Sequence, residues 1–190
     1  AFMAGYLSSM VAEDWRAGGL LSSNTLPVDS IIDAFYNGGK LICNNCAPVY
    51  PPYPSYSPLY QDVTGKSGAD MLADVNALAR YKIDTLFVSA TADLPEVLDA
   101  AETAGMFLIG ENAASANAAR YAAILGYDMK TTVESMLPAA LAGQGGQTAV
   151  TKVVLAFVNN TQKVTPGKQV QFAATAELLA NDKIIPLSVP

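Results

Sequence analysis

The residues best suited to chemistry follow two short apolar runs, 83–88 and 106–109, which a helical pattern separates. The polar side chains after these runs are Ser89, Thr91, Asp93, Glu111 and Asn112. Strand, helix and strand at this spacing predict a parallel βαβ unit, whose two strands end at one edge of a sheet. Ligands of open α/β sheets bind outside that edge, so we expect these side chains to contact a ligand.

Each of these residues also has a purely structural interpretation. Asn112 is a common turn residue at the end of a strand, and Glu111 can be a solvated charge near a helix N-terminus. Asp93 is expected to cap the helix that follows it. Ser89 and Thr91 can be ordinary polar residues of the loop, so the sequence leaves both interpretations open.

The chain contains no histidine. This excludes Ser-His-Asp and Cys-His catalysis and histidine-ligated zinc. No glycine motif that binds phosphate is present either, so we predict a binding protein without catalytic residues, cofactor or metal. Two alternatives stay open: a flavodoxin-like enzyme that uses Glu111, Asp93 or Lys130 in acid–base or Schiff-base chemistry, and a non-catalytic interaction domain.

The composition is that of a folded domain. Of 190 residues, 51% are hydrophobic and 15% are charged, which excludes a disordered tail. Seventeen acidic and eleven basic residues give a net charge of −6, and no lysine or arginine cluster is present. A nucleic-acid partner is therefore not expected. No apolar run approaches the roughly 18 residues that a membrane span needs.

Cys43 and Cys46 are the only cysteines and lie three positions apart. We predict that they form a disulfide, as in an exported protein. Free thiols or a redox pair are alternatives, but no predicted helix follows the pair, as a redox motif would require. No further cysteine or histidine could complete a zinc site.

The periodicity of apolar residues predicts an α/β, three-layer sandwich with a mostly parallel sheet. The predicted strands are 16–22, 83–88, 106–109, 121–125 and 152–158. The predicted helices are 2–13, 29–39, 68–81, 94–101, 130–141 and 169–181, with Asp29 as a cap. Residues 47–60 are rich in proline and tyrosine and are predicted as an extended loop or flap, whose tyrosines could stack on a planar ligand or pack on the protein itself.

The chain begins within a helical pattern that has neither an initiator methionine nor a signal-peptide pattern. We therefore expect a processed or truncated chain that lacks an upstream βα portion. Residues 15–125 are predicted to form one nearly complete lobe. Residues 1–14 and 126–190 would belong to a partner lobe or border it. Exposed apolar helix faces would then favour a homodimer or a partner that carries the missing portion.

Several short motifs, spread over nearly the whole chain, resemble the basic membrane protein family. These proteins are solute receptors similar to type I periplasmic binding proteins; they are usually lipoproteins that serve ABC importers, and purine-nucleoside receptors are among them. The motifs are Ala1-Phe-Met-Ala-Gly-Tyr-Leu7, Phe35-x-x-Gly38, Asp62-Val-x-Gly65-Lys66, Ile83-Asp-Thr-Leu-Phe87, Leu108-Ile-Gly-Glu-Asn112 and Ile124-Leu-Gly-Tyr-Asp-Met-Lys130. The resemblance implies an extracytoplasmic receptor that binds a small polar or nucleoside-like ligand and has an ABC transporter permease as its partner.

The resemblance also implies which residues face the ligand. Asn112 stands at the family's carboxylate position, Lys130 at its lysine and Phe35 at its aromatic residue. Ala114 and Ser115 replace the Asp and Gln of the family pattern, and a site without that carboxylate need not read a ribose. Phe35 could equally pack in the core, and Lys130 could be a surface lysine near the start of a helix.

Overall fold

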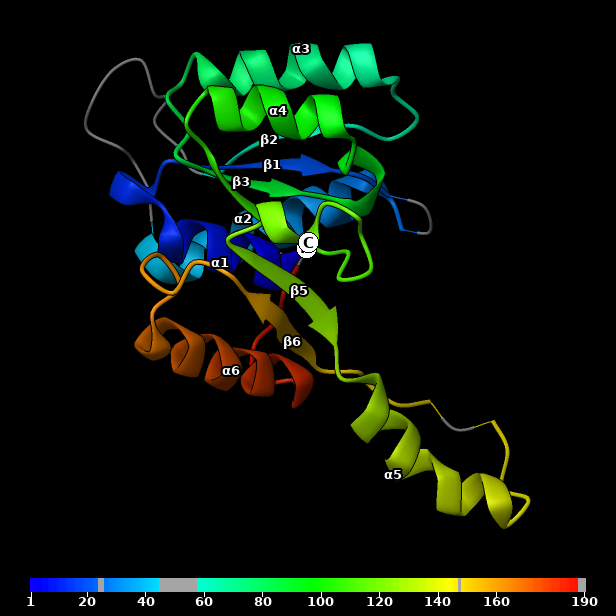
Figure 1. The fold of residues 1–190 in the computed structure, drawn as a ribbon. Helices are drawn as coiled ribbons and strands as arrows, with labels where there is room; N and C mark the ends of the chain where they lie inside the picture. The colour runs from blue at the N-terminus through cyan, green and yellow to red at the C-terminus, as the bar shows by residue number, and fades with distance from the viewer. Residues whose placement is uncertain (24–25, 45–57, 147, 188–190) are drawn as a thin grey trace.

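The computed structural model describes residues 1–23, 26–44, 58–146 and 148–187. They form a six-stranded sheet between two layers of helices (Figure 1). The strands are β1 (Ala17–Leu21), β2 (Leu59–Asp62), β3 (Thr85–Val88), β4 (Phe107–Gly110), β5 (Ala123–Tyr127) and β6 (Val153–Val158). Their order is β2-β1-β3-β4-β5-β6, and all neighbours are parallel except β5 and β6. The predicted α/β sandwich with a mostly parallel sheet is confirmed.

The helices are α1 (Phe2–Val11), α2 (Val28–Cys43), α3 (Gly68–Ala79), α4 (Pro95–Thr103), α5 (Met129–Leu141) and α6 (Pro166–Ala180). Helices α1, α2 and α6 share one hydrophobic core with the sheet, and α3 and α4 share the core on the opposite face. Successive residues of each central strand enter opposite cores, as Leu86 and Phe87 do. Because both faces are covered, these strands read as continuous apolar runs in the sequence.

Helices α1 and α2 cross in backbone contact at two glycines. A β-carbon placed on Gly5 would lie 1.8 Å from the Phe35 carbonyl oxygen, and one on Gly38 would lie 1.9 Å from the Phe2 carbonyl oxygen. Only glycine leaves room for a crossing this close. The contact holds the first turn of α1 beside α2, on the face of the sheet that both helices cover.

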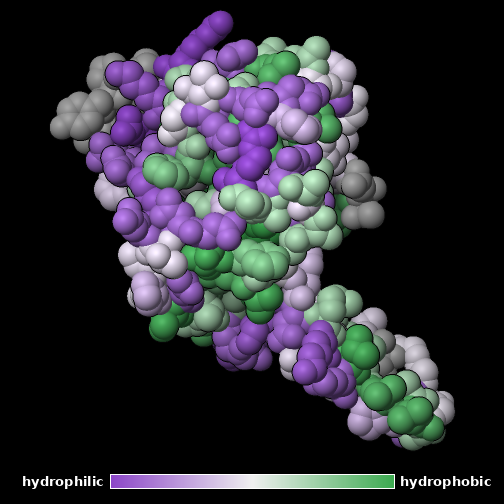
Figure 2. Space-filling model, viewed as in Figure 1, coloured by the Kyte–Doolittle hydropathy of each residue, from purple (hydrophilic) through white to green (hydrophobic). Residues whose placement is uncertain are grey.

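Helix α5 projects from the rest of the molecule as an arm, beyond the ends of β5 and β6 (Figure 1). None of its residues is buried. Hydrophobic side chains lie exposed along it (Figure 2). Among the described residues, no helix combines the length and the apolar character that a membrane span requires.

The segments predicted to belong to a partner lobe, or to border it, take three positions. Helix α1 packs against α2 and the sheet, β6 and α6 extend that sheet and its core, and α5 points away from both. The division into residues 15–125 and the flanking segments 1–14 and 126–190 stays a prediction.

Several predicted boundaries were wrong. Strand β2 begins at Leu59, inside the segment predicted as a loop through residue 60, and it escaped detection because it is a short edge strand after proline-rich sequence. Helix α6 begins at Pro166, since the Thr165 side chain caps it by accepting from the Lys168 N–H. The residue that caps α2 is Pro27, and Asp29 lies within the first turn. Most of the proline- and tyrosine-rich segment, with Cys46, lies outside the described residues, so the disulfide with Cys43 stays a prediction.

Candidate functional site

The two predicted polar loops meet at one edge of the sheet. Strands β3 and β4 are parallel and Val88 is in register with Gly110, so their carboxyl ends lie together. The Glu111 Oε1 atom accepts a hydrogen bond from the Ala90 N–H at 2.8 Å. This contact holds the carboxylate of one loop against the backbone of the other. The predicted βαβ unit is confirmed.

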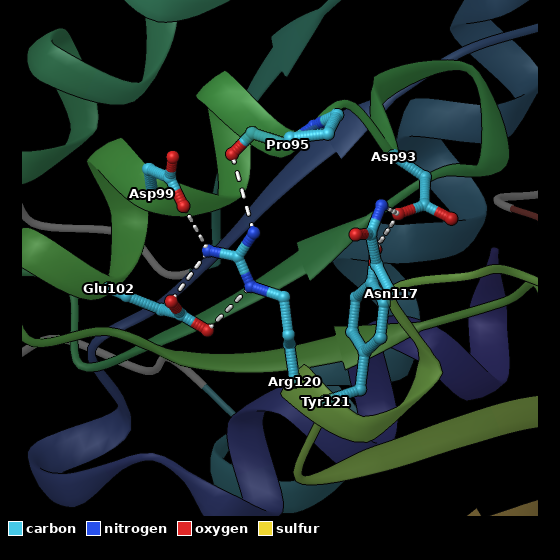
Figure 3. A network of polar contacts seen from close by, with 7 residues as sticks. All are labelled: Asp93, Pro95, Asp99, Glu102, Asn117, Arg120 and Tyr121. Atoms are coloured by element: carbon cyan, nitrogen blue, oxygen red, sulfur yellow. Dashed lines mark hydrogen bonds and ion pairs between the residues drawn. The ribbon is translucent and has the colours of Figure 1, made fainter.

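The side chain of Asp93, in the loop after β3, contacts the loop after β4 (Figure 3). Its Oδ1 atom accepts from Tyr121 Oη at 2.9 Å and from Asn117 Nδ2 at 3.0 Å. Burial of the phenol, and then its hydrogen bond to Asp93, raise the pKa of Tyr121 well above its usual range. The predicted capping role of Asp93 is wrong, because α4 is capped at Leu94 without a side-chain hydrogen bond.

Arg120, in the loop after β4, connects that loop to α4 (Figure 3). Its guanidinium donates to both carboxylate oxygens of Glu102, at 2.6 and 3.1 Å, and to Asp99 at 2.7 Å. The hydrogen bonds to Glu102 raise the pKa of the guanidinium further above its usual range. A planar cation paired in this way is a structural clamp. The role of Arg120 could not be predicted from the sequence, because its partners lie 18 and 21 positions earlier, at no spacing that forms a motif.

A cavity of about 440 Å³ opens on the same edge of the sheet, on the side of α1 and α2. Its walls come from the first turns of α1 and α2, from Phe87 on β3, from the end of β5 and start of β6, and from residues 186–187. The lining is mostly apolar, and among the described residues Glu111 is the one charged side chain in it. A lining of this kind suits the enclosure of a small molecule.

The predicted site residues lie at different distances from this cavity. Glu111 lines it. Phe35 is fully buried and packs on the Phe87 ring at 6.0 Å between ring centroids, so it supports the wall from behind. Ser89 is buried, and its hydroxyl has no hydrogen-bond partner among the described residues. Thr91 Oγ1 accepts a hydrogen bond from Ser22 Oγ at 3.0 Å, which joins the ends of β1 and β3.

Asn112 and Lys130 do not line the cavity. The Asn112 Oδ1 atom accepts from the Ala114 N–H at 3.2 Å, which is the geometry of an Asx turn. Lys130 lies on α5 with 84% of its side chain exposed, and its ammonium is 3.9 Å from Glu134. The described residues contain no cluster of three or more histidine, cysteine, aspartate or glutamate side chains that could hold a metal ion.

The likeness of this chain to known proteins lies in its structure. No protein-family model matches this chain, and no curated protein does. A solved structure of an ABC transporter system solute-binding protein from Conexibacter woesei DSM 14684 is similar, with 19% sequence identity and a TM-score of 0.64. The alignment covers 100% of this chain and 63% of that protein, so this chain spans less than two thirds of its length. The chain therefore shares its α/β fold with that part of the solute-binding protein.

Proposed function

We propose that this chain is the ligand-binding part of an extracytoplasmic solute receptor, which delivers a small molecule to an ABC transporter permease without transforming it. The cavity of about 440 Å³ at the carboxyl edge of the sheet carries the proposal. Its size and apolar walls are those of a small-molecule site, and its position is where open α/β sheets bind ligands. The fold that the chain shares with an ABC transporter solute-binding protein supports the same role.

The finer assignment rests on the motifs. Their resemblance to the basic membrane protein family supports a receptor anchored as a lipoprotein outside the cytoplasmic membrane. Of the site residues that the sequence suggests, Glu111 is the one we place in direct contact with the ligand, because it lines the cavity. The other suggested residues do not line the cavity: Asn112, Lys130, Ser89, Thr91 and Phe35. Contact with these residues stays a proposal, and it requires a ligand that extends past the cavity or a second lobe that holds the ligand against them.

The arm formed by α5 supports a two-lobed receptor. Its apolar residues are exposed along the helix. Exposed apolar patches mark sites of contact with another protein or domain. We propose that residues 15–125 provide most of one lobe and that α5 packs on a second lobe. Residues 1–14 include helix α1, whose first turn lines the cavity.

Native mass spectrometry of freshly purified protein tests the binding role directly. A small molecule should co-purify, and its release on denaturation should give its mass. The Ser30→Leu substitution should reduce its occupancy at least about tenfold, because a leucine on α2 would fill part of the cavity. Ser30→Ala, which adds no volume at the same position, is the matched control. Empty protein, together with no response to a broad library of solutes in thermal-shift measurements, would contradict a receptor. So would reproducible turnover that Glu111→Gln abolishes.

A further inference from the structure

We infer that the cavity takes a mainly apolar ligand with a hydrogen-bond donor group, an amine or a hydroxyl, that contacts Glu111. This inference rests on the proposed function and names the chemical class of its ligand. It departs from the small polar or nucleoside-like ligand that the motifs suggest, because the cavity walls supply few polar partners.

The walls determine what the body of the ligand can be. They include Phe2, Met3, Ile31, Phe87, Leu125 and Leu179. A sugar or an amino acid placed among such side chains would leave most of its hydroxyl, carboxylate or ammonium groups without partners. Buried polar groups without partners are costly, whereas apolar ligand surface gains free energy when it leaves water.

Glu111 determines the polar end. Its Oε1 atom is held by the Ala90 N–H, which fixes the carboxylate at the edge of the cavity. A carboxylate can accept several hydrogen bonds, so its second oxygen can accept one from a ligand. Hydrogen bonds to an ionised group are about twice as strong as neutral ones. A donor on the ligand is therefore favoured at this point.

The charges around the cavity disfavour an anionic ligand. No lysine or arginine lines the cavity among the described residues. Ala1 lines it, but burial lowers the pKa of its α-amino group and so favours the neutral form of that group. The first turns of α1 and α2 also face the cavity, but a helix N-terminus has a partial charge of only about half a unit. The full negative charge of Glu111 outweighs such a partial charge where the ligand's polar group lies. A carboxylate or phosphate at this position would be repelled.

Three probes with one apolar body and different head groups test the inference. They are 2-(1-naphthyl)ethylamine, 2-(1-naphthyl)ethanol and 1-naphthylacetate, and calorimetry gives their affinities. We expect the amine and the alcohol to bind and the carboxylate to bind at least about tenfold more weakly. Glu111→Gln should weaken the amine about tenfold to a hundredfold, because it removes a charge-assisted hydrogen bond. Glu111→Gln should also reduce the difference in affinity between the amine and the carboxylate.

Glu134→Gln is the matched control, since Glu134 lies on the exposed α5 arm and does not line the cavity. It should leave all three affinities within about twofold, and Ser30→Leu should weaken the amine and the alcohol together. Equal affinities for the three head groups, or a preference for the carboxylate, would overturn the inference. Binding of sugars, amino acids or nucleosides in place of the probes would overturn it too and leave the receptor role standing. If neither probes nor solutes bind, both the inference and the proposed function fail.

Discussion

Asp93 and Tyr121 show how a single carboxylate oxygen can organise a site without touching a ligand. Asp93 Oδ1 accepts two hydrogen bonds from the loop after β4, while Glu111 of that loop accepts one from the loop after β3. Each loop therefore donates hydrogen bonds to the other loop and accepts them from it. Because burial raises the pKa of the Tyr121 phenol, the stability of the folded state depends on pH.

Replacement of Tyr121 by Phe should make this dependence measurable. The raised pKa means that the folded state keeps the phenol protonated where the unfolded state, with a pKa of about 10, releases the proton. Wild-type stability should therefore fall relative to Tyr121→Phe as the pH rises above 10, by up to about 1.4 kcal/mol per pH unit. Below pH 9 the variant should be about 1–2 kcal/mol less stable, because Asp93 loses a donor. Urea denaturation of both proteins from pH 8 to 11 gives the difference. A difference that does not change with pH would contradict the burial of the phenol.

The disulfide between Cys43 and Cys46 is a second prediction at this scale. In protein prepared under oxidising conditions, alkylation without reductant should add no label, and alkylation after reduction should add two. Intact-mass measurement distinguishes the two states. Two labelled thiols before reduction would show that the pair is free.

Of the residues that the sequence suggested, Glu111 could be placed at the carboxyl edge of the sheet because it follows a predicted strand. The cavity that it lines could not be predicted, because its walls come from segments far apart in the sequence. The sequence could not tell Glu111 from Asn112, its neighbour, whose side chain closes a turn instead. That difference depends on which way each side chain leaves the loop. The Asp93, Asn117 and Tyr121 cluster was beyond prediction for another reason: its members meet only after the sheet forms.

At the scale of elements, the crossing of α1 and α2 fixes one wall of the cavity. Gly5 and Gly38 allow the two backbones to touch, and the residues that begin α1 and α2 then face the same space. A wider crossing would move the first turn of α1 away from the sheet. The glycines therefore contribute to the site although neither lines it.

Gly38→Ala should destabilise the fold despite the better helix propensity of alanine, which favours the variant by up to about 1 kcal/mol. Its β-carbon would lie 1.9 Å from the Phe2 carbonyl oxygen, so the helices must separate. We expect a net loss of about 3 kcal/mol in the free energy of unfolding. Gly145→Ala is the control, because a β-carbon there meets nothing within 4 Å. Chemical denaturation of the two variants decides, and equal stability would show that α1 and α2 are less closely packed.

The central strands and their helices could be predicted from sequence because burial on both faces leaves long apolar runs, as at 83–88 and 106–109. The exceptions lie at the margins of the fold. Leu59 begins an edge strand, which among the described residues pairs with β1 alone. Helix α6 begins at Pro166 because the Thr165 side chain caps it by a hydrogen bond to a residue three positions later. Local signals of this kind are weak beside the periodicity of a buried element.

At the scale of the whole molecule, the arm formed by α5 carries a stripe of exposed apolar side chains. Met129, Val133, Leu137 and Leu141 follow one another at intervals of four along α5, and each is about half exposed or more. Residues at this spacing lie on one side of a helix. Such a stripe in contact with water favours association.

Leu137→Lys should therefore leave the folding of the main body unchanged and weaken contact with a second lobe or a second copy. We expect the free energy of unfolding to change by no more than about 0.5 kcal/mol, as for other surface positions. Association measured by sedimentation velocity should weaken at least about tenfold, because a lysine would be buried in an apolar contact. Ser135→Lys, on the opposite side of α5, is the control. Equal effects of the two substitutions would exclude the stripe as an interface.

The cavity draws its walls from both ends of the chain, from Phe2 to Ala4 and from Pro186 to Leu187. These two segments lie more than 180 positions apart in the sequence, so the cavity is complete only when both have packed against the same edge of the sheet. A tag inserted at residues 143–146, in the exposed turn at the far end of the arm, would leave the cavity clear.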